Sequence, residues 1–360
     1  MSQNFRNIAL AAAMVAATGM AFGARQPTQT QYASPLGASL FANAGLHGFD
    51  GVVQLKLTNN SGQVLKVPYW QLPSDRMEGN LFQVTSNGRV ATYTGPLVKR
   101  GAPTEADMVV FQPHETKLVS VNLAKFYDLK GGDVTIRFSS LLQDSRFGGR
   151  LGTLQTAPLR VWIDGASLSG GGSQAKPGGT ATVVNGVAFK SCSSTQITGA
   201  GQAVVDARIC TENSKQYTIA GTVGARYTTW FGAYTSSRYS TVKSHYAAID
   251  TAMDYSSPTV VANQVTINCG CNQSYYAFVY PNQPYEIHVC KAFWTAPATG
   301  TDSKAGTLIH EMSHFTVTAS TDDWVYGQAG AMDLANTNPT NAIDNADNHE
   351  YFAENNPFQN

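Results

Sequence analysis

In this 360-residue chain, the segment that most limits the possible fold and chemistry is His310-Glu311-Met312-Ser313-His314. The run around it, residues 305–315, has no Pro and enough apolar side chains to be helical. Residues four apart lie on one face of a helix, so the two imidazoles would face one point, an arrangement that suits a zinc ion. Glu311 could then act as a general base on water. A chance occurrence on a solvated helix is the alternative. The segment predicts a helix that carries a metal centre.

The composition and the N-terminal residues indicate the cellular compartment of the protein and exclude some classes of partner. The formal net charge is +0 and 13% of the residues are charged. There is no basic stripe, so we expect no nucleic-acid partner. Arg6 precedes an apolar run, residues 8–22, and Ala21 and Gly23 offer small residues for cleavage, which is typical of a secretory signal peptide over residues 1–23. No other segment could cross a bilayer. We therefore expect a secreted, extracellular protein.

The remaining chain divides into two regions with different patterns. Residues 24–165 contain short runs of alternating apolar and polar residues, such as Val53, Leu55 and Leu57, separated by turn residues. This pattern predicts an all-β, Ig-like sandwich. Residues 166–191 are rich in Gly and Ser, as in a flexible linker. Residues 192–360 favour helices, so we expect a mainly α (α+β) domain there. The fold class is thus two domains.

All five cysteines lie in the second region, at Cys192, Cys210, Cys269, Cys271 and Cys290. In an oxidising compartment they predict two disulfides and one remaining thiol. The sequence alone does not fix the pairing, although Cys269 and Cys271 are too close to pair easily with each other. A zinc site made of cysteines competes with this interpretation, but there is no Cys-x-x-Cys spacing.

A catalytic zinc usually takes three protein ligands, and two places could supply the third. Asp322 and Asp323 follow the second His closely and would lie on a loop. Glu350 and Glu354 lie on the last expected helix, residues 342–354. A loop aspartate and a glutamate from a separate helix could both reach the metal, so spacing leaves the choice open.

The second region resembles a known family of peptidases. The motif His-Glu-x-x-His-Phe, followed by Thr321-x-Asp323-x-x-Tyr326-Gly327, is similar to that of the aspzincin (deuterolysin) metalloendopeptidases. The likeness covers about residues 190–360 and is strongest to their peptidyl-Lys metalloendopeptidase branch. The matching segments include residues 226–232, 277–282, 300–303 and 345–352. Ser320 departs from the pattern, where the family usually has Gly.

The resemblance implies a zincin-type domain, its cofactor and its site residues. One Zn²⁺ would be held by His310, His314 and Asp323. Glu311 would be the base and Tyr326 would stabilise the transition state. The other implied residues are Asp347 and Glu350, which would bind the substrate lysine, and the disulfides Cys192–Cys269 and Cys271–Cys290. Cys210 would remain as a small buried apolar residue.

The resemblance further implies hydrolysis on the N-terminal side of lysine in protein and peptide substrates. Many carboxylates between residues 301 and 360, against the single cation Lys304, also favour cationic substrates. Two alternatives stay open. One is a zincin with a glutamate as third ligand and broad specificity; the other is a non-enzymatic, secreted, zinc-binding toxin or adhesin module.

The order of the regions suggests a precursor. A signal peptide, a β domain and a flexible linker precede a region that covers a complete peptidase, so we hypothesise that residues 24–165 form a bacterial-type β propeptide domain. This domain would be a partner of the peptidase and would make the protein a zymogen. The enzyme could cut its own linker before Lys176 or Lys190. A permanent targeting or substrate-binding domain is the competing hypothesis.

Overall fold

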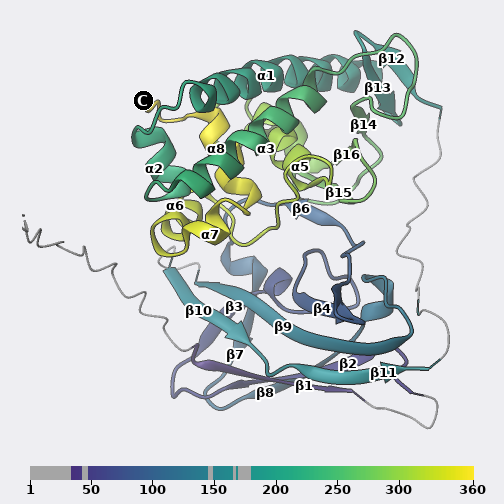
Figure 1. Ribbon diagram of the computed structural model, residues 1–360, viewed down its shortest axis with the longest axis vertical. Helices are drawn as coiled ribbons and strands as arrows, with labels where there is room; N and C mark the ends of the chain where they lie inside the picture. The colour runs from purple at the N-terminus through teal and green to yellow at the C-terminus, as the bar shows by residue number, and fades with distance from the viewer. Residues whose placement is uncertain (1–33, 43–47, 145–148, 165–167, 169–179) are drawn as a thin grey trace, which may run out of the picture. The chain divides into compact units, whose positions relative to one another are not determined.

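The computed structural model describes residues 34–42, 48–144, 149–164, 168 and 180–360 (Figure 1). The expected signal peptide, most of the expected linker and Lys176 lie outside these residues. The described residues belong to one unit, residues 31–360. Within the described residues, no helix has both the length and the apolar character that a membrane span requires.

The front region is built from antiparallel strands in three sheets. The sheet orders are β1-β2-β8, then β10-β9-β4-β5 with β11 paired to β9, then β3-β7. Short 3-10 helices cover Tyr69–Gln71, Glu105–Asp107 and Leu123–Lys125. The strands are β1 (Leu36–Ala42), β2 (Val52–Asn59), β3 (Leu65–Pro68), β4 (Phe82–Ser86), β5 (Arg89–Val90), β7 (Met108–Phe111), β8 (Thr116–Asn122), β9 (Gly132–Asp144), β10 (Gly149–Gln155) and β11 (Leu159–Ile163).

Alternating side chains form the core of this region, as the sequence pattern predicts. Val53, Leu55 and Leu57 of β2 are fully buried, and so are Ile136 and Phe138 of β9. These residues from two different sheets belong to one hydrophobic cluster. The all-β character is therefore confirmed, whereas the Ig-like strand arrangement remains a prediction.

The second region combines helices with a six-stranded sheet of order β12-β13-β14-β16-β15-β6. Helices α1, α3, α5 and α8 lie together beside this sheet in Figure 1. The helices are α1 (Ser194–Ile219), α2 (Ala225–Phe231), α3 (Ser236–Asp254), α4 (Lys291–Thr295), α5 (Lys304–His314), α6 (Gln328–Thr337), α7 (Pro339–Ala342) and α8 (Ala346–Glu354). The strands are β12 (Thr182–Val184), β13 (Val187–Lys190), β14 (Thr266–Asn268), β15 (Ala277–Val279) and β16 (Glu286–Val289), and β6 covers Leu97–Lys99.

Two boundaries differ from the expectation. The last part of the expected linker 166–191 is not linker, because β12 and β13 pair with each other and β13 pairs with β14. The helix expected over 342–354 begins later, at Ala346, because Asn345 precedes α8 with an extended backbone; Ala342 is the last residue of the separate helix α7. The helical character expected of residues 192–360 is confirmed, for example by the long helix that covers Ser236–Asp254.

Strand β6 connects the two regions. It comes from the front region, yet it pairs antiparallel with β15 at the edge of the second region's sheet. Leu97, Val98 and Lys99 are all buried. The chain therefore places three front residues in the sheet that borders α5.

The cysteines pair as the resemblance implies. Disulfides join Cys192 to Cys269 and Cys271 to Cys290. Cys210 on α1 is a free thiol. Burial, followed by nearby carboxylates, raises its pKa to about 11, so it stays protonated and unreactive at neutral pH.

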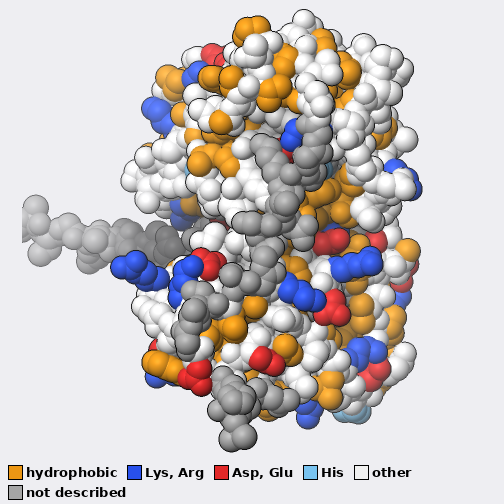
Figure 2. All heavy atoms as spheres, turned by 90° about the vertical axis from the view of Figure 1, so that its right-hand side faces the viewer, with side chains coloured by type: hydrophobic (Ala, Val, Ile, Leu, Met, Phe, Trp, Pro, Cys, Tyr) orange, Lys and Arg blue, Asp and Glu red, His pale blue; other side chains and the backbone are white. Residues whose placement is uncertain are grey.

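The face shown in Figure 2 carries charges of both signs. They gather over the front region, while the helical region on the same face is largely polar and uncharged or hydrophobic. On this face the charges are interspersed and form no stripe of one sign.

Candidate active site

Helix α5 carries the three side chains that the sequence singled out, all at buried positions. His310, Glu311 and His314 are fully buried, and the two imidazole rings lie with their centroids 4.8 Å apart. The helix begins at Ser303, whose hydroxyl accepts a hydrogen bond from the backbone N–H of Gly306 at 2.9 Å. The predicted helix and the convergence of its two imidazoles are therefore confirmed.

Three potential ligand atoms face each other at one end of this arrangement. Oδ1 of Asp323 lies 3.2 Å from Nε2 of His310 and 3.5 Å from Nε2 of His314. Among the described residues, none of these three atoms has a hydrogen-bond partner, although all are buried. Orphaned buried nitrogen and carboxylate atoms that converge in this way fit a zinc ion.

Hydrogen bonding occupies Nδ1 of His314 and leaves Nε2 available as a metal ligand. Its Nδ1–H donates to the carbonyl oxygen of Thr321 at 2.7 Å, so Nε2 keeps its lone pair. His310 directs its Nδ1 toward Oδ1 of Asp347 at 2.9 Å. Both rings thus turn Nε2 toward Asp323.

The loop between α5 and α6 is held by the turn before α8. The side-chain oxygen of Asn345 accepts from the backbone N–H groups of Trp324 and Val325 at 2.8 and 3.2 Å. Ser320, at the start of the loop, has a φ of 54°. Gly would adopt this left-handed conformation without strain, so Ser320 is held in a conformation that favours the family's usual residue.

The other carboxylates considered as third ligand have other partners. Asp322 accepts a hydrogen bond from the Asn80 side chain at 3.2 Å. Glu354 accepts from the backbone N–H and the hydroxyl of Ser303, both at 2.8 Å. Glu350 lies 3.3 Å from His310, but on the Nδ1 side of the ring. Of the four candidates, only Asp323 has an oxygen near both Nε2 atoms.

The predicted lysine-binding carboxylates do bind a lysine, and it belongs to the chain itself. The ammonium of Lys99 lies 3.0 Å from Asp347, 2.7 Å from Glu350 and 3.0 Å from Asp302. Its side chain has no exposed surface. Burial alone would lower the pKa of Lys99, but Asp347 and Glu350 raise it well above its ordinary value. The ammonium is therefore charged in this pocket.

Asp302 and two aromatic rings are parts of the lysine pocket that sequence reasoning missed. The Lys99 ammonium lies 5.2 Å from the ring centroid of Tyr351 and 5.8 Å from that of Tyr276. Tyr351 also donates to Asp302 at 2.8 Å. The only hint of this in the sequence was that residues 300–303, which include Asp302, resemble the family. Because Asp302 lies on a loop, its spacing does not predict where its side chain points.

The peptide bond between Val98 and Lys99 lies against the remaining predicted residues. The Tyr326 hydroxyl donates to the Val98 carbonyl oxygen at 2.8 Å. The Lys99 N–H donates to Oε1 of Glu311 at 3.1 Å. The Val98 N–H donates to Oδ2 of Asp323 at 3.1 Å. Burial raises the pKa of Glu311 to about 7, against the opposing effect of the two histidines.

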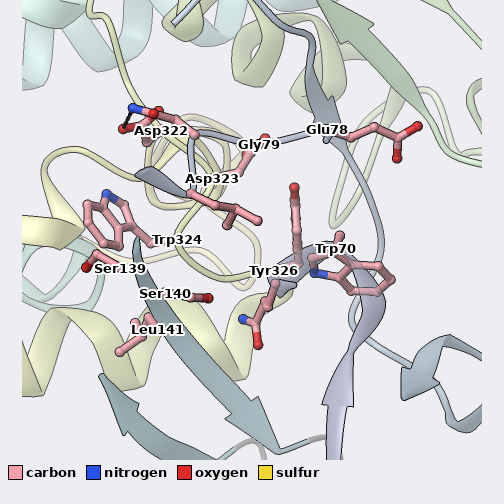
Figure 3. Close-up of a pocket in the computed structure, with 13 residues that line it drawn as sticks. Trp70, Glu78, Gly79, Ser139, Ser140, Leu141, Asp322, Asp323, Trp324 and Tyr326 are labelled. Atoms are coloured by element: carbon pink, nitrogen blue, oxygen red, sulfur yellow. Dashed lines mark hydrogen bonds between the residues drawn. The ribbon is translucent and has the colours of Figure 1, made fainter. Parts of the chain in front are cut away.

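A pocket that Asp323 and Tyr326 help to line is formed by both regions (Figure 3). Trp70, Glu78 and the segment 139–141 come from the front region, and residues 322–324 and Tyr326 come from the second. Trp70 packs edge-on against Tyr326, with ring centroids 5.8 Å apart. The loop between α5 and α6 and the front region therefore share a packed boundary at this point.

Comparison with known proteins identifies the family. The family model described as lysine-specific metallo-endopeptidase (aspzincin) matches residues 216–354. An extracellular protease from Aeromonas hydrophila is 39% identical over 317 residues, covering 86% of this chain and 89% of that protein. The chain belongs to the aspzincin family. A peptidyl-Lys metalloendopeptidase from Grifola frondosa is 34% identical, covering 90% of this chain and 97% of that protein. A solved zinc peptidase from Grifola frondosa is 44% identical, covers 47% of this chain and all of its own, and has a TM-score of 0.44.

Membership in the aspzincin family shows the general activity of the chain. This aspzincin is an extracellular metalloendopeptidase that uses zinc and acts on peptide substrates. The non-enzymatic toxin or adhesin module considered from the sequence is therefore wrong. The buried ligand atoms described above fit the metal that the family requires.

Proposed function

We propose that this aspzincin cuts peptide bonds on the N-terminal side of lysine and that it is made as a precursor that processes itself. One observation carries the proposal. A lysine of the chain, Lys99, lies in a pocket of three carboxylates while the peptide bond before it lies against Glu311 and Tyr326. A substrate lysine in the same pocket would present the bond on its N-terminal side to the same groups.

In this proposal His310, His314 and Asp323 hold one zinc ion. The 3.2 and 3.5 Å separations from Oδ1 of Asp323 to the two Nε2 atoms support this choice over Glu350 and Glu354. Zinc, when bound, supplies Lewis-acid activation of the attacking water and of the scissile carbonyl. The Thr321 carbonyl oxygen and the Asp347 carboxylate, which contact the Nδ1 atoms of the two imidazoles, would hold the ligand atoms in the orientation that such an ion needs.

The chain's own residues handle the proton and the developing charge. Glu311 would take the proton of the attacking water. Its Oε1 lies 3.1 Å from the Lys99 amide nitrogen, so the same group can pass the proton to the leaving amine. Tyr326 donates to the carbonyl oxygen at 2.8 Å, where negative charge develops when the carbonyl carbon becomes tetrahedral.

The pocket favours lysine over arginine. An ammonium presents three donors from one point, and Asp302, Asp347 and Glu350 each lie within 3.0 Å of that point. A guanidinium spreads its donors over a wider plane and would need the three carboxylates, two of them fully buried, to move apart. Buried groups in a packed environment resist such a shift.

The front region, residues 24–165, would be the propeptide, and the cut would fall in the linker. Lys190 lies in β13, where its ammonium is 2.8 Å from Glu286. Hydrolysis before Lys190 would require this buried strand to open, which makes Lys176 the better candidate. N-terminal sequencing of the secreted, processed protein should give Lys176 first, whereas a mature chain that still starts near residue 24 would contradict the precursor hypothesis.

A proteomic digest tests the specificity. A denatured protein mixture should be digested with and without a chelator, and the residues on both sides of each cut identified. We expect Lys after nearly every cut and no cutting with the chelator. Zinc content of Asp323→Ala and Glu350→Ala separates the rival ligand sets. Loss of zinc only from the Glu350 variant, or cuts without a lysine preference, would favour the broad-specificity zincin.

A further inference from the structure

We propose that Asn345 is a positioning residue that holds residues 322–327, here called the ligand loop, in place. In this loop Asp323 faces the two imidazoles of α5, and Tyr326 presents its hydroxyl to a peptide carbonyl oxygen. The inference rests on the proposed function, which gives these two side chains their roles, and it names the residue that orients both.

The ligand loop is joined to the turn before α8 by its first residue. The backbone N–H of Asp322 donates to the carbonyl oxygen of Asp344 at 2.7 Å, and the Asp322 carbonyl oxygen accepts from the N–H of Ala346 at 3.1 Å. These two hydrogen bonds flank Asn345 and form a parallel bridge between it and Asp322. The start of the loop therefore runs alongside Asn345.

The Asn345 side chain holds the middle of the ligand loop. Its Oδ1 accepts from the backbone N–H groups of Trp324 and Val325 at 2.8 and 3.2 Å. Its Nδ2 donates back to the Val325 carbonyl oxygen at 3.3 Å. At the end of the loop, the N–H of Gly327 donates to Oδ2 of Asp347 at 2.7 Å. The turn and the first residues of α8 thus bind four of the six loop residues.

The two other loop residues, Asp323 and Tyr326, are the ones with proposed chemical roles. Each of them has an attached residue on both sides in the sequence. A backbone that is held on both sides of a residue limits the directions in which its side chain can point. Supporting contacts of this kind keep a metal ligand and a hydrogen-bond donor within the small tolerance that catalysis allows. One side chain therefore orients both groups.

An asparagine side chain matches the groups that the ligand loop offers. An amide has two acceptor lone pairs and two N–H donors. Asn345 uses all four, because its Nδ2 also donates to Oδ1 of Asn348 at 2.7 Å. An Asn directly before a helix usually caps that helix, whereas Asn345 directs its oxygen to the loop. Its side chain therefore serves the loop rather than its own helix.

Asn348 offers a matched control on the same helix. It is fully buried, as Asn345 is, and its Nδ2 donates to the carbonyl oxygens of Trp230 on α2 and Ala331 on α6. These hydrogen bonds attach α8 to helices that carry none of the proposed site residues. Leucine at either position removes the amide at similar volume. A purely structural role of Asn345 predicts the same outcome for both leucine variants.

The test compares the secreted, zinc-loaded wild type with Asn345→Leu, Asn345→Asp and Asn348→Leu. Competition with a chelator gives the zinc affinity, and kinetics on a single-lysine peptide at saturating zinc gives kcat and KM. We expect Asn345→Leu to weaken zinc binding at least about tenfold and to lower kcat. KM should change little, because the carboxylates around the lysine ammonium lie outside the loop.

The other two variants test whether the effect belongs to the loop contacts. Asn345→Asp keeps an acceptor oxygen for the two loop N–H groups and should regain most of the zinc affinity. Asn348→Leu should lower Tm while its zinc affinity stays within about twofold of the wild type. Equal losses of zinc affinity in the two leucine variants would overturn the positioning role.

Asp323→Ala separates a failure of this inference from a failure of the proposed function. If Asp323→Ala binds zinc as the wild type does, the proposed ligand set fails. If it loses zinc while Asn345→Leu keeps the wild-type affinity, only the role of Asn345 fails.

Amide hydrogen exchange of the metal-free, wild-type full chain covers the case of a variant that does not fold. The N–H groups of Trp324 and Val325 should be protected from exchange, because Asn345 holds them before a metal binds. Protection that appears only after zinc is added would mean that the metal orders the loop, and the proposal would then be wrong.

Discussion

Asp347 contacts both the bound lysine and a candidate zinc ligand. Its Oδ1 lies 3.0 Å from the Lys99 ammonium and 2.9 Å from Nδ1 of His310. Its Oδ2 accepts from the backbone N–H of Gly327 at 2.7 Å, which fixes its orientation. A single carboxylate therefore contacts the Lys99 ammonium and also orients the imidazole of His310, so in the proposed function it would serve both lysine recognition and zinc binding.

Asp347→Asn should weaken zinc binding and lysine recognition together. Loss of a carboxylate behind a ligating imidazole typically lowers metal affinity about 10- to 100-fold. Asp302→Asn is the matched comparison, because Asp302 contacts the lysine ammonium from a loop. It should raise KM for lysine peptides while zinc affinity stays unchanged. Competition with a chelator gives the zinc affinity, and steady-state kinetics gives KM.

Equal effects of the two substitutions on zinc affinity would contradict the double role of Asp347. Unchanged zinc affinity in Asp347→Asn, with a higher KM alone, would limit this residue to substrate binding. The two readouts therefore distinguish a residue that positions His310 from one that only attracts a cation.

Ser320→Gly should stabilise the protein. Ser320 is exposed and has a φ of 54°, a left-handed conformation that costs a non-glycine residue about 1 kcal/mol. Glycine removes this strain but adds freedom to the unfolded chain, so we expect a net gain of up to about 1 kcal/mol. Urea unfolding measures it. A lower free energy of unfolding in the variant would mean that the serine side chain contributes more than the strain costs.

At the scale of elements, the contact between α5 and α8 determines whether the zinc and lysine sites meet. Gly306 makes their close approach possible. A Cβ atom at this position would lie 2.0 Å from Oε1 of Glu354 and 3.0 Å from Cγ of Glu350. Glu354 in turn accepts hydrogen bonds from Ser303 at the start of α5. The helix that carries the histidines is thus attached at its first turn to the helix that carries the lysine pocket.

Gly306→Ala should therefore separate these helices. We expect a loss of about 1–3 kcal/mol, as for other overpacked sites, together with lower activity. Gly199→Ala on α1 is the control, because a Cβ atom there meets nothing within 4 Å. It should stabilise by up to about 1 kcal/mol through helix propensity. Denaturant unfolding of both variants is the measurement, and a neutral or stabilising Gly306→Ala would contradict the packing argument.

Local patterns in the sequence predicted the elements that depend on local spacing. The four-residue spacing of His310 and His314 determines a shared helix face, and the alternation of Val53, Leu55 and Leu57 determines a strand face. The start of α8 at Ala346 was missed, because Asn345 before it is held by the backbone N–H groups of residues 324 and 325, about twenty positions earlier, which donate to its side-chain oxygen.

The parts of the site that come from distant segments could not be predicted. Leu97, Val98 and Lys99 are consecutive buried residues and show no alternation that indicates a strand. Their partners lie at residues 277–279, so the pairing depends on the tertiary fold. The one signal for this placement was a lysine that follows an apolar residue. It stands in a chain whose second half resembles lysine-directed peptidases.

At the scale of the whole molecule, one pair of buried histidines makes the free energy of unfolding depend on pH. His245 of α3 and His349 of α8 lie 3.0 Å apart between Nδ1 and Nε2. Burial lowers the pKa of His245 from 6.5 to about 4. Burial, and then repulsion from His245, lowers the pKa of His349 from 6.5 to about 3. Both are neutral in the folded protein at pH 6, whereas the unfolded chain would bind protons there.

This difference stabilises the fold above pH 6.5, and the stabilisation is lost as the pH falls from 6.5 toward 4 and then 3. His245→Gln keeps a hydrogen-bond donor and removes one titrating group. We expect the wild type to lose on the order of 2 kcal/mol more than the variant over this range. Thermal unfolding at several pH values, in the same buffer and zinc concentration, gives the difference. Parallel Tm curves would contradict the assignment.

The edge of β15 sets a conformational requirement on anything the enzyme cuts. Under the proposed lysine specificity, a chain that replaces β6 there must be extended over three consecutive residues and must also send a lysine side chain into an enclosed pocket. Lysines within helices or tight turns cannot meet both conditions without local melting. Intact globular proteins should therefore be attacked mainly at loose termini and long loops, and the rate of their digestion should follow how readily such stretches unravel.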